Sequence, residues 1–207
     1  MLVSGTGTNL RALLEAAARP GFPARIALVL SNRPSAGALG IARDHGVEAA
    51  AMPVSAFGGD TAARDAAMRD RLLAAGVRLV VCAGYDRVLD PCLLEAFGDA
   101  ILNLHPSLLP AFAGGMHAVE DALEAGVRVS GCTVHVLATG ATDGGPIVLQ
   151  AAVPVLEDDD AGRLRARIHE QEWRLLPEAV ALWCDGRLRR EGRRVRILPL
   201  PVGGPRR

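Results

Sequence analysis

Hydrophobic positions along this chain follow two spacings that alternate from one end to the other. Short apolar runs predict buried strands over residues 25–30, 48–52, 77–83, 100–104, 130–137 and 146–155. Between these runs, apolar residues recur with the spacing of a helix over 10–18, 36–45, 61–75, 92–97 and 118–125. Gly46, Gly76 and Gly126 follow three of the helical segments, at the position where a left-handed residue ends a helix.

This alternation predicts the class of fold. Strands and helices in succession are typical of an α/β protein whose sheet is doubly wound and mostly parallel. A long C-terminal helix is predicted over 161–184, followed by Asp185-Gly186 and a short strand pair over 187–198. No repeat or linker interrupts the pattern, so we expect a single domain over 1–207. Only three residues precede the loop that begins at Ser4, so either the first strand is very short or the start of the protein lies upstream.

Length and composition indicate the size of the domain and the cellular compartment of the protein. Its 207 residues, half of them apolar, suffice for one α/β core. No apolar run of about eighteen residues is present and the first residues do not resemble a signal peptide. We therefore expect a cytoplasmic protein with no membrane partner. The four cysteines show no Cys-x-x-Cys spacing, which argues against a zinc site or a disulfide framework.

Charge is unevenly distributed. The formal net charge is zero, but the last 21 residues carry eight Arg and one Glu. A nucleic-acid-binding tail and a solvated strand pair are both consistent with this pattern. We favour the strand pair and expect no nucleic-acid partner.

The segment SGTGTNL at 4–10 lies between a predicted strand end and a helix start. Its glycines allow a sharp turn that aims backbone N–H groups at an anion. A dinucleotide fingerprint is not satisfied, because Leu10 replaces the third glycine and no acidic residue ends the next strand. A monophosphate is the better match. The alternative is an ordinary strand-to-helix turn with Thr8 as the N-cap.

Three polar residues follow predicted strands in a pattern that suits catalysis. Asn103 and His105 are two residues apart at a strand end, so both side chains face the same side, at the edge where α/β sheets bind ligands. Asp143 lies in the Gly-rich loop TDGGP that leads into the next strand. Taken separately, each signal is weak: a lone histidine at such a place is more often structural, and Asp143 could be a plain turn aspartate.

Taken together, the motifs resemble a known family. The loop SGTGTNL, the stretch NLHPSLLP at 103–110 and the loop DGGP at 143–146 recur in this order in glycinamide ribonucleotide formyltransferases, as do AGYDRVL at 83–89, GCTVH at 131–135 and Gln171-Glu172. The resemblance runs from Leu2 to about Leu198. It implies a Rossmann-like formyltransferase fold and transfer of a formyl group from 10-formyltetrahydrofolate, the co-substrate, to the amine of glycinamide ribonucleotide, without a metal.

The resemblance also implies roles for individual residues. Asn103 and a protonated His105 would stabilise the oxyanion that forms when the amine attacks the formyl carbon. Asp143 would hold His105 charged and help to take the proton that the amine loses, directly or through water. The remaining contacts are implied as follows: substrate phosphate at Gly7, Thr8 and Asn9; ribonucleotide at Glu172 and Ser107; folate at Tyr85, Arg87, Val88, Leu89, Asn103, Thr139 and Asp143.

On this basis the domain is expected to divide into a phosphate-binding part over about 1–100, a catalytic and folate-binding part over about 80–198 and an Arg-rich tail over 199–207. The partners would be the two small-molecule substrates, and the protein a monomer or a homodimer.

Several features depart from the family pattern. No Arg follows Phe57, and the nearest candidate, Arg64, is shifted along a helix. Asp86 stands where the family more often has an apolar or basic residue. The stretches 112–117 and 138–142 each look one residue longer than usual.

Related activities are the alternatives. A methionyl-tRNA formyltransferase is expected to need a further nucleic-acid domain of roughly a hundred residues. A formyltetrahydrofolate hydrolase is expected to carry an extra N-terminal regulatory domain, and it is the second choice among enzymes. A non-catalytic binding module is the alternative outside enzymes, and the joint presence of Asn103, His105 and Asp143 argues against it.

Overall fold

The computed structural model describes residues 1–137 and 143–200. One sheet holds the strands in the order β3-β2-β1-β4-β5-β6-β7-β9-β8. The strands are β1 (Leu2–Val3), β2 (Leu28–Ser31), β3 (Glu48–Ala51), β4 (Val80–Ala83), β5 (Ile101–His105), β6 (Val129–Val136), β7 (Ile147–Pro154), β8 (Leu188–Glu191) and β9 (Arg194–Ile197). The helices are α1 (Thr8–Ala17), α2 (Gly37–Asp44), α3 (Thr61–Ala74), α4 (Pro91–Phe97), α5 (Ala118–Glu124) and α6 (Ala161–Cys184), with a 3₁₀ turn η1 (Val54–Phe57).

The pairing of strands confirms the predicted α/β class. Strands β1 to β5 are parallel, with β1 between β2 and β4. The sheet then continues antiparallel through β6 and β7. The predicted terminal strand pair is present as β8 and β9, and β9 joins β7 in parallel. The reversal at β1 creates a switch point, the place where open α/β sheets bind ligands.

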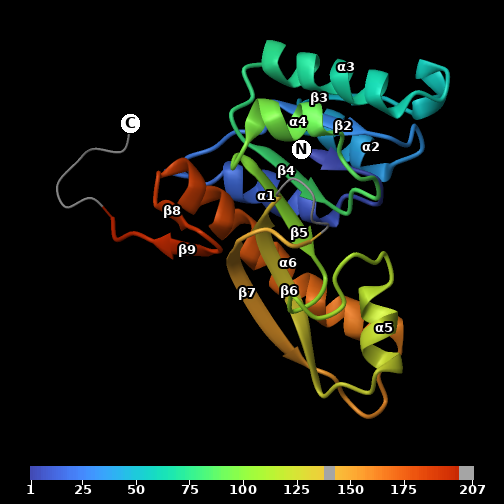
Figure 1. The fold of residues 1–207 in the computed structure, drawn as a ribbon, viewed down its shortest axis with the longest axis vertical. Helices are drawn as coiled ribbons and strands as arrows, with labels where there is room; N and C mark the ends of the chain where they lie inside the picture. Colours follow the sequence, from blue (N-terminus) through green and yellow to red (C-terminus); the bar gives the residue numbers. More distant parts are fainter. Residues whose placement is uncertain (138–142, 201–207) are drawn as a thin grey trace.

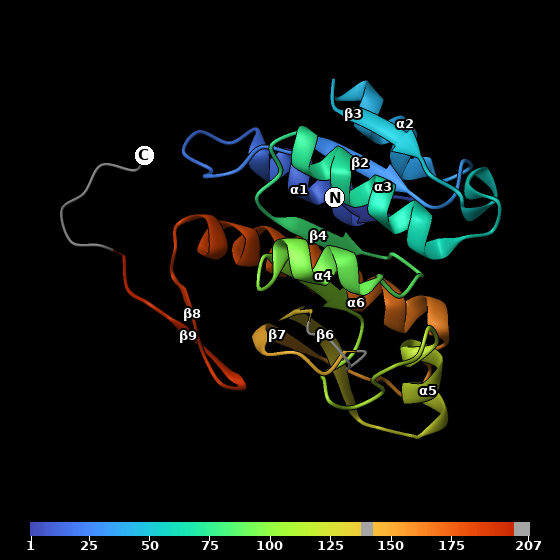
Figure 2. The same cartoon turned by 45° about the horizontal axis from the view of Figure 1, so that its top comes forward.

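Helices cover both faces of the sheet, as a doubly wound fold requires (Figures 1 and 2). Successive residues of a strand point to opposite faces. Val3, Val29 and Val81 accordingly pack in one core with α1, α2 and α6. Leu2, Leu30 and Cys82, their neighbours along the same strands, pack in a second core with α3 and α4. Burial on both faces explains why these strands read as continuous apolar runs.

Some predicted boundaries were wrong. The strands expected from residues 25 and 77 begin at Leu28 and Val80, and η1 was not predicted. Thr8 is the first residue of α1 rather than its cap; Gly7, at φ 88°, occupies the cap position without a side-chain hydrogen bond. The left-handed glycines were predicted correctly, because Gly46, Gly76 and Gly126 have φ of 70°, 66° and 66°.

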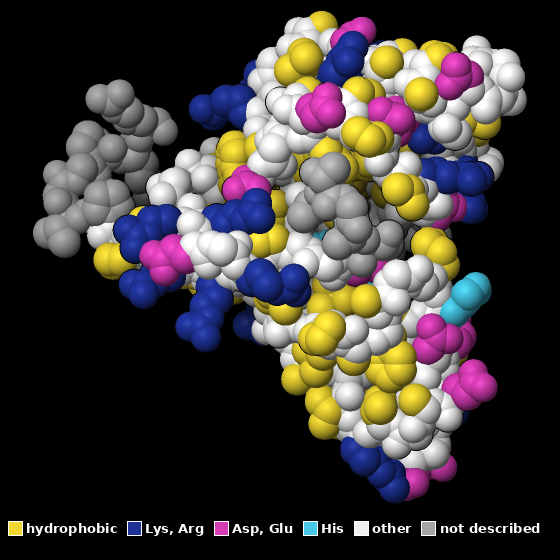
Figure 3. Space-filling model, in the orientation of Figure 1, with side chains coloured by type: hydrophobic (Ala, Val, Ile, Leu, Met, Phe, Trp, Pro, Cys, Tyr) yellow, Lys and Arg dark blue, Asp and Glu magenta, His cyan; other side chains and the backbone are white. Residues whose placement is uncertain are grey.

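Figure 3 shows Arg side chains gathered over the β8–β9 hairpin. Ion pairs occupy several of them: Glu191 contacts both Arg189 and Arg196, and Arg190 contacts Asp99. Residues 201–207 lie outside the described residues. Within the described part of the chain, no helix combines the length and the apolar composition needed to cross a bilayer.

Candidate active site

A cleft of about 670 Å³ opens at the carboxyl ends of β4 and β5. Its lining combines the wall that follows β4, the end of β5, the loop around Gly114 and one face of α6. The residues named from the sequence that line it are Asn9, Tyr85, Arg87, Val88, Leu89, Asn103, His105, Asp143 and Glu172. Segments distant in sequence therefore meet at the edge of the sheet where the switch point predicts a ligand site.

Asn103, His105 and Asp143 come together in this cleft. The period of two along β5 places Asn103 and His105 on the same face. Asp143 lies across from both: its Oδ1 is 3.3 Å from Asn103 Nδ2, and its Oδ2 is 3.3 Å from His105 Nδ1. The structure therefore brings the three residues named from the sequence into direct contact.

The loop after β5 completes this arrangement with backbone groups. His105 Nε2 is 3.0 Å from the carbonyl oxygen of Phe112, and the Gly114 N–H donates to Asp143 Oδ2 at 2.9 Å. Each ring nitrogen of His105 thus faces an oxygen atom that can accept a hydrogen bond. Phe112 and Asp143 reach these positions with φ of 56° and 54°, a left-handed conformation that is uncommon outside glycine.

Sequence reasoning missed His135 as a member of this cluster. It lies on β6 directly opposite Asn103 and is fully buried. Its Nε2 is 3.0 Å from Asn103 Nδ2 and 3.5 Å from Asp143 Oδ1. Without a proton, this nitrogen accepts a hydrogen bond from Asn103; with a proton, it donates to Asp143 instead. The available signal was a histidine within the motif GCTVH, on a strand with no other ionised side chain.

The surroundings of Asp143 keep it ionised. Burial by itself would raise the pKa of this carboxyl group. A hydrogen bond from His135, the Gly114 N–H and the charges of His105 and His135 outweigh burial and lower the pKa below its ordinary value. At neutral pH the group is therefore a carboxylate, available to receive a proton and to stabilise a positive neighbour.

The loop at 4–10 packs tightly against α2. A Cβ atom added at Gly7 would lie 2.7 Å from the Ala38 Cα, so this glycine is required by the fold. The backbone N–H groups of Gly5, Thr6 and Gly7 donate to no other residue in the described part of the chain. They precede the N-terminus of α1, where an anion is favoured.

Asn9 connects this loop to α6. Its Nδ2 donates to Glu172 Oε2 at 2.9 Å, and His169 Nε2 lies 3.8 Å from the same carboxyl oxygen. Burial raises the pKa of Glu172, although the hydrogen bond from Asn9 opposes this shift. Ser107, by contrast, is fully buried outside the cleft lining, and its hydroxyl donates to the carbonyl of Ala111. Its predicted contact with the ribonucleotide stays a prediction.

The wall after β4 carries the residues expected to meet folate. Val88 is 80% exposed, whereas Leu89 is buried. Tyr85 lines the cleft, while its hydroxyl contacts Met68 Sδ of α3. Thr139, also expected to contact folate, lies outside the described residues.

Arg64 does not reach the cleft. It is 1% exposed and paired with Asp65, whose side chain is equally buried. Its Nε lies 2.7 Å from Asp65 Oδ1, and the other oxygen of Asp65 accepts the backbone N–H of Asp90 at 2.7 Å. Asp65, paired with Arg64, therefore connects α3 to the start of α4, and Arg64 is not a substitute for an Arg after Phe57.

Comparison with known proteins identifies the relatives of this chain. The family model described as formyl transferase matches residues 1–180. The chain belongs to this family. Among relatives of this formyl transferase, the phosphoribosylglycinamide formyltransferase of Haemophilus influenzae is 39% identical over 91% of the chain and 88% of the relative. A glycinamide ribonucleotide transformylase 1 structure from Symbiobacterium toebii has 52% identity and a TM-score of 0.92, covering 96% of this chain and 92% of that one.

The formyl transferase also matches one segment of a larger protein. It is 41% identical to the trifunctional purine biosynthetic protein adenosine-3 of Drosophila melanogaster over 90% of its own length, but spans only 14% of that relative.

The chemistry that the site supports follows from its side chains. An amide, an imidazole and a carboxylate in contact provide hydrogen-bond donors for a developing oxyanion and an acceptor for a proton. Across the described residues, no group of three or more His, Cys, Asp and Glu is placed to hold a metal ion.

Proposed function

We propose that this formyl transferase moves the formyl group of 10-formyltetrahydrofolate to the amine of glycinamide ribonucleotide, a step of purine biosynthesis. The observation that carries the proposal is the contact of Asn103, His105 and Asp143 in one cleft. The same cleft is lined by Asn9 of the loop at 4–10, which we call the phosphate loop. Similarity to enzymes of that name over nearly the whole chain supports the choice of substrates.

In the proposed reaction the amine attacks the formyl carbon, and the carbonyl oxygen becomes an oxyanion. Asn103 Nδ2 is directed at this position by His135, and its 3.3 Å contact with Asp143 is the one we expect the formyl oxygen to replace. When His105 is protonated, its charge, beside Asp143 and the Phe112 carbonyl, would stabilise the oxyanion further.

Proton transfer completes the reaction. Asp143 receives the proton lost by the attacking amine, directly or through a water molecule. The bond between the formyl carbon and the folate nitrogen then breaks, and that nitrogen leaves with a proton. The lowered pKa of Asp143 supports a role in which the carboxylate is ionised before the amine arrives.

The substrates are assigned to opposite ends of the cleft. The ribonucleotide phosphate would meet the N–H groups at Gly7, Thr8 and Asn9, and Glu172 would bind the ribose or the glycinamide end. Folate would lie along Arg87, Val88 and Leu89, mostly against main-chain atoms. We also propose that residues 1–207 act as one functional unit, a monomer or homodimer, on small molecules alone.

A direct assay tests this function. Purified protein is supplied with 10-formyltetrahydrofolate, with and without glycinamide ribonucleotide, and both tetrahydrofolate and formylated amine are measured. We expect tetrahydrofolate to form only with the ribonucleotide present, in equal amount to the formylated amine. Release of formate without the ribonucleotide would instead identify a formyltetrahydrofolate hydrolase, and binding without turnover a non-catalytic module.

A further inference from the structure

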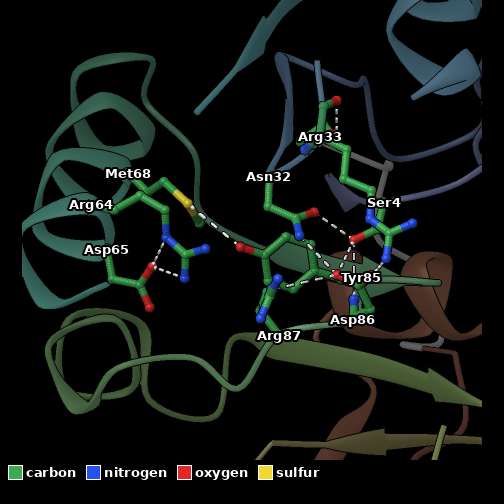
Figure 4. A network of polar contacts seen from close by, with 10 residues as sticks. Ser4, Asn32, Arg33, Arg64, Asp65, Met68, Tyr85, Asp86 and Arg87 are labelled. Atoms are coloured by element: carbon green, nitrogen blue, oxygen red, sulfur yellow. Dashed lines mark hydrogen bonds and ion pairs between the residues drawn. The ribbon is translucent and has the colours of Figure 1, made fainter. Parts of the chain in front are cut away.

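Asp86 stands at the centre of a polar network beside the cleft (Figure 4). Asn32 Nδ2 donates to its Oδ1 at 2.7 Å, and the guanidinium of Arg33 pairs with its Oδ2. The backbone N–H of Asp86 donates to Ser4 Oγ at 3.0 Å. Ser4 Oγ is in turn 2.6 Å from Asn32 Oδ1. Asp86 therefore uses both its backbone and its carboxylate in the same network.

The partners of Asp86 come from the carboxyl ends of different strands. Ser4 follows β1 and opens the phosphate loop, while Asn32 and Arg33 follow β2. Asp86 itself follows β4 and belongs to the cleft wall that continues to Leu89. A second contact joins the same segments, because the Ser4 N–H donates to the Gly84 carbonyl at 2.9 Å. The network thus fastens the proposed folate wall to the base of the phosphate loop.

Charge balance indicates why an acidic residue is tolerated next to an anion site. The Asp86 side chain is only 11% exposed, so its charge needs compensation from the protein. Burial alone would raise its pKa, but hydrogen bonds from Asn32 and Ser4 and the charges of Arg33 and Arg87 lower the pKa. Arg33 is 56% exposed and supplies the compensating charge from the solvent side.

We propose that Asp86 is a positioning residue that sets the distance between the folate wall and the phosphate loop, with Arg33 as its neutralising partner. The inference rests on the proposed function, because it assigns the two substrates to those two segments. Asp86 touches no reacting atom in this scheme. Its loss weakens the binding of both substrates and leaves the chemical step nearly intact.

Asp86→Asn is the direct test, since it preserves the shape of the side chain and removes the charge. We expect KM for the ribonucleotide and KM for the folate each to rise about tenfold, the effect of losing one charge-assisted hydrogen bond. We expect kcat to stay within about twofold. Arg33→Gln shifts both KM values in the same direction, whereas Arg33→Lys restores most of the wild-type affinity because it keeps the charge.

A matched control separates positioning from general stability. Arg69→Gln breaks an ion pair with Asp70 on the exposed side of α3, and neither KM changes. Thermal unfolding is measured for every variant. A lower melting temperature for Asp86→Asn with unchanged KM values would overturn the proposal and leave Asp86 a purely structural residue, as would an equal rise of KM in the control.

Separate titrations of glycinamide ribonucleotide and tetrahydrofolate distinguish this proposal from the proposed function. Wild-type binding of both ligands without turnover would refute the proposed function alone, and the affinities of the variants would still decide the role of Asp86. Weakened binding of only one ligand in Asp86→Asn would refute the role of Asp86 as a link between the two segments.

Discussion

Asp143 is constrained both by its side-chain contacts and by its backbone conformation. Its carboxylate contacts Asn103 and His105 and accepts the Gly114 N–H, while its backbone has a φ of 54°. Asparagine is among the few residues that adopt this conformation readily. Asp143→Asn therefore removes the charge with little disturbance of the loop, which makes it a clean probe of proton transfer.

We expect Asp143→Asn to lower kcat by about a hundredfold or more, as loss of a principal electrostatic group does. Ribonucleotide affinity should be nearly unchanged, because the carboxylate acts on His105 and on the proton. Steady-state kinetics and calorimetry with the ribonucleotide check the two parts. Loss of affinity in step with activity would contradict this role.

The lowered pKa of Asp143 further predicts how its charge depends on pH. The carboxylate stays ionised at pH values below the ordinary pKa of an aspartate and loses its charge only as the pH falls through the lowered pKa.

The pKa of Glu172 is shifted in the opposite direction from that of Asp143, so it predicts the opposite dependence of stability on pH. Its pKa is raised by burial, so the folded state binds a proton more tightly than the unfolded state. Its contribution to stability is greatest below the ordinary pKa and is lost as the pH rises through the raised value. Glu172→Gln, which keeps an acceptor for Asn9, should melt at a higher temperature than the wild type at about pH 8. The difference should disappear near pH 4, and an equal difference at both values would exclude the ionisation of Glu172 as its cause.

At this scale the sequence predicted residues better than contacts. Asn103 and His105 could be placed on one face because strand periodicity fixes side-chain direction. The partnership of Asn103 with His135 depends on the register between β5 and β6, which no local pattern contains. The contact of His105 with the Phe112 carbonyl was equally unpredictable. Every residue has a backbone carbonyl, and only the conformation of the loop directs this one toward His105.

Among the elements, the phosphate loop and α2 are joined more closely than the sequence indicated. The glycine pattern predicted a turn, but the reason for Gly7 is its approach to Ala38 across the loop. An anion-binding role for the loop and a packing role for this glycine are therefore separate properties.

Gly7→Val should consequently impair folding rather than phosphate binding alone. A side chain there meets the Ala38 Cα at 2.7 Å with a backbone φ of 88°, so both overlap and strain oppose it. We expect a loss of at least about 2 kcal/mol in the free energy of unfolding, typical of overpacking combined with an unfavourable backbone conformation. Urea denaturation measures it. A stable variant that has lost only ribonucleotide affinity would contradict this prediction. It would show that the loop can shift away from α2 to accommodate the added side chain.

Helices α3 and α4 depend on the buried pair of Arg64 and Asp65. Removing one partner of a buried ion pair leaves an uncompensated charge and costs roughly 3–5 kcal/mol. Arg64→Ala should lower the free energy of unfolding by that amount, whereas Arg69→Ala, on the exposed side of α3, should change it by less than about 0.5 kcal/mol. Chemical denaturation of both variants provides the comparison. Equal, small effects would mean that Arg64 is solvated in solution.

Over the whole molecule, the sheet has a stable centre and a weakly attached edge. Strand β5 pairs on both sides with β4 and β6, while β9 meets β7 at the single pair Ile147 and Arg194. The overall class was predictable because most residues of the parallel strands are apolar. The pairing of β9 with β7 was not predictable from the sequence, since the hairpin sequence is dominated by arginine.

Amide hydrogen exchange should reveal this difference in stability between the centre and the edge of the sheet. Amides of β5 should exchange on the order of a hundredfold more slowly than those of β8, because edge strands open without global unfolding. Mass spectrometry of peptic peptides covering Ile101–His105 and Leu188–Glu191 makes the measurement. Uniform protection across both strands would show that the hairpin unfolds together with the core.

The separation of the two cores by the sheet also limits how this sequence can change over time. Val29 and Leu30 are neighbours in the chain, yet each belongs to a different set of packing partners. Substitutions on the same face share partners and are non-additive, whereas substitutions on opposite faces act more independently. We therefore expect a destabilising change at Leu30 to be compensated by substitutions at Met68 or Leu72 rather than at Leu13 or Leu176, so that each face of the sheet accumulates its compensating substitutions separately.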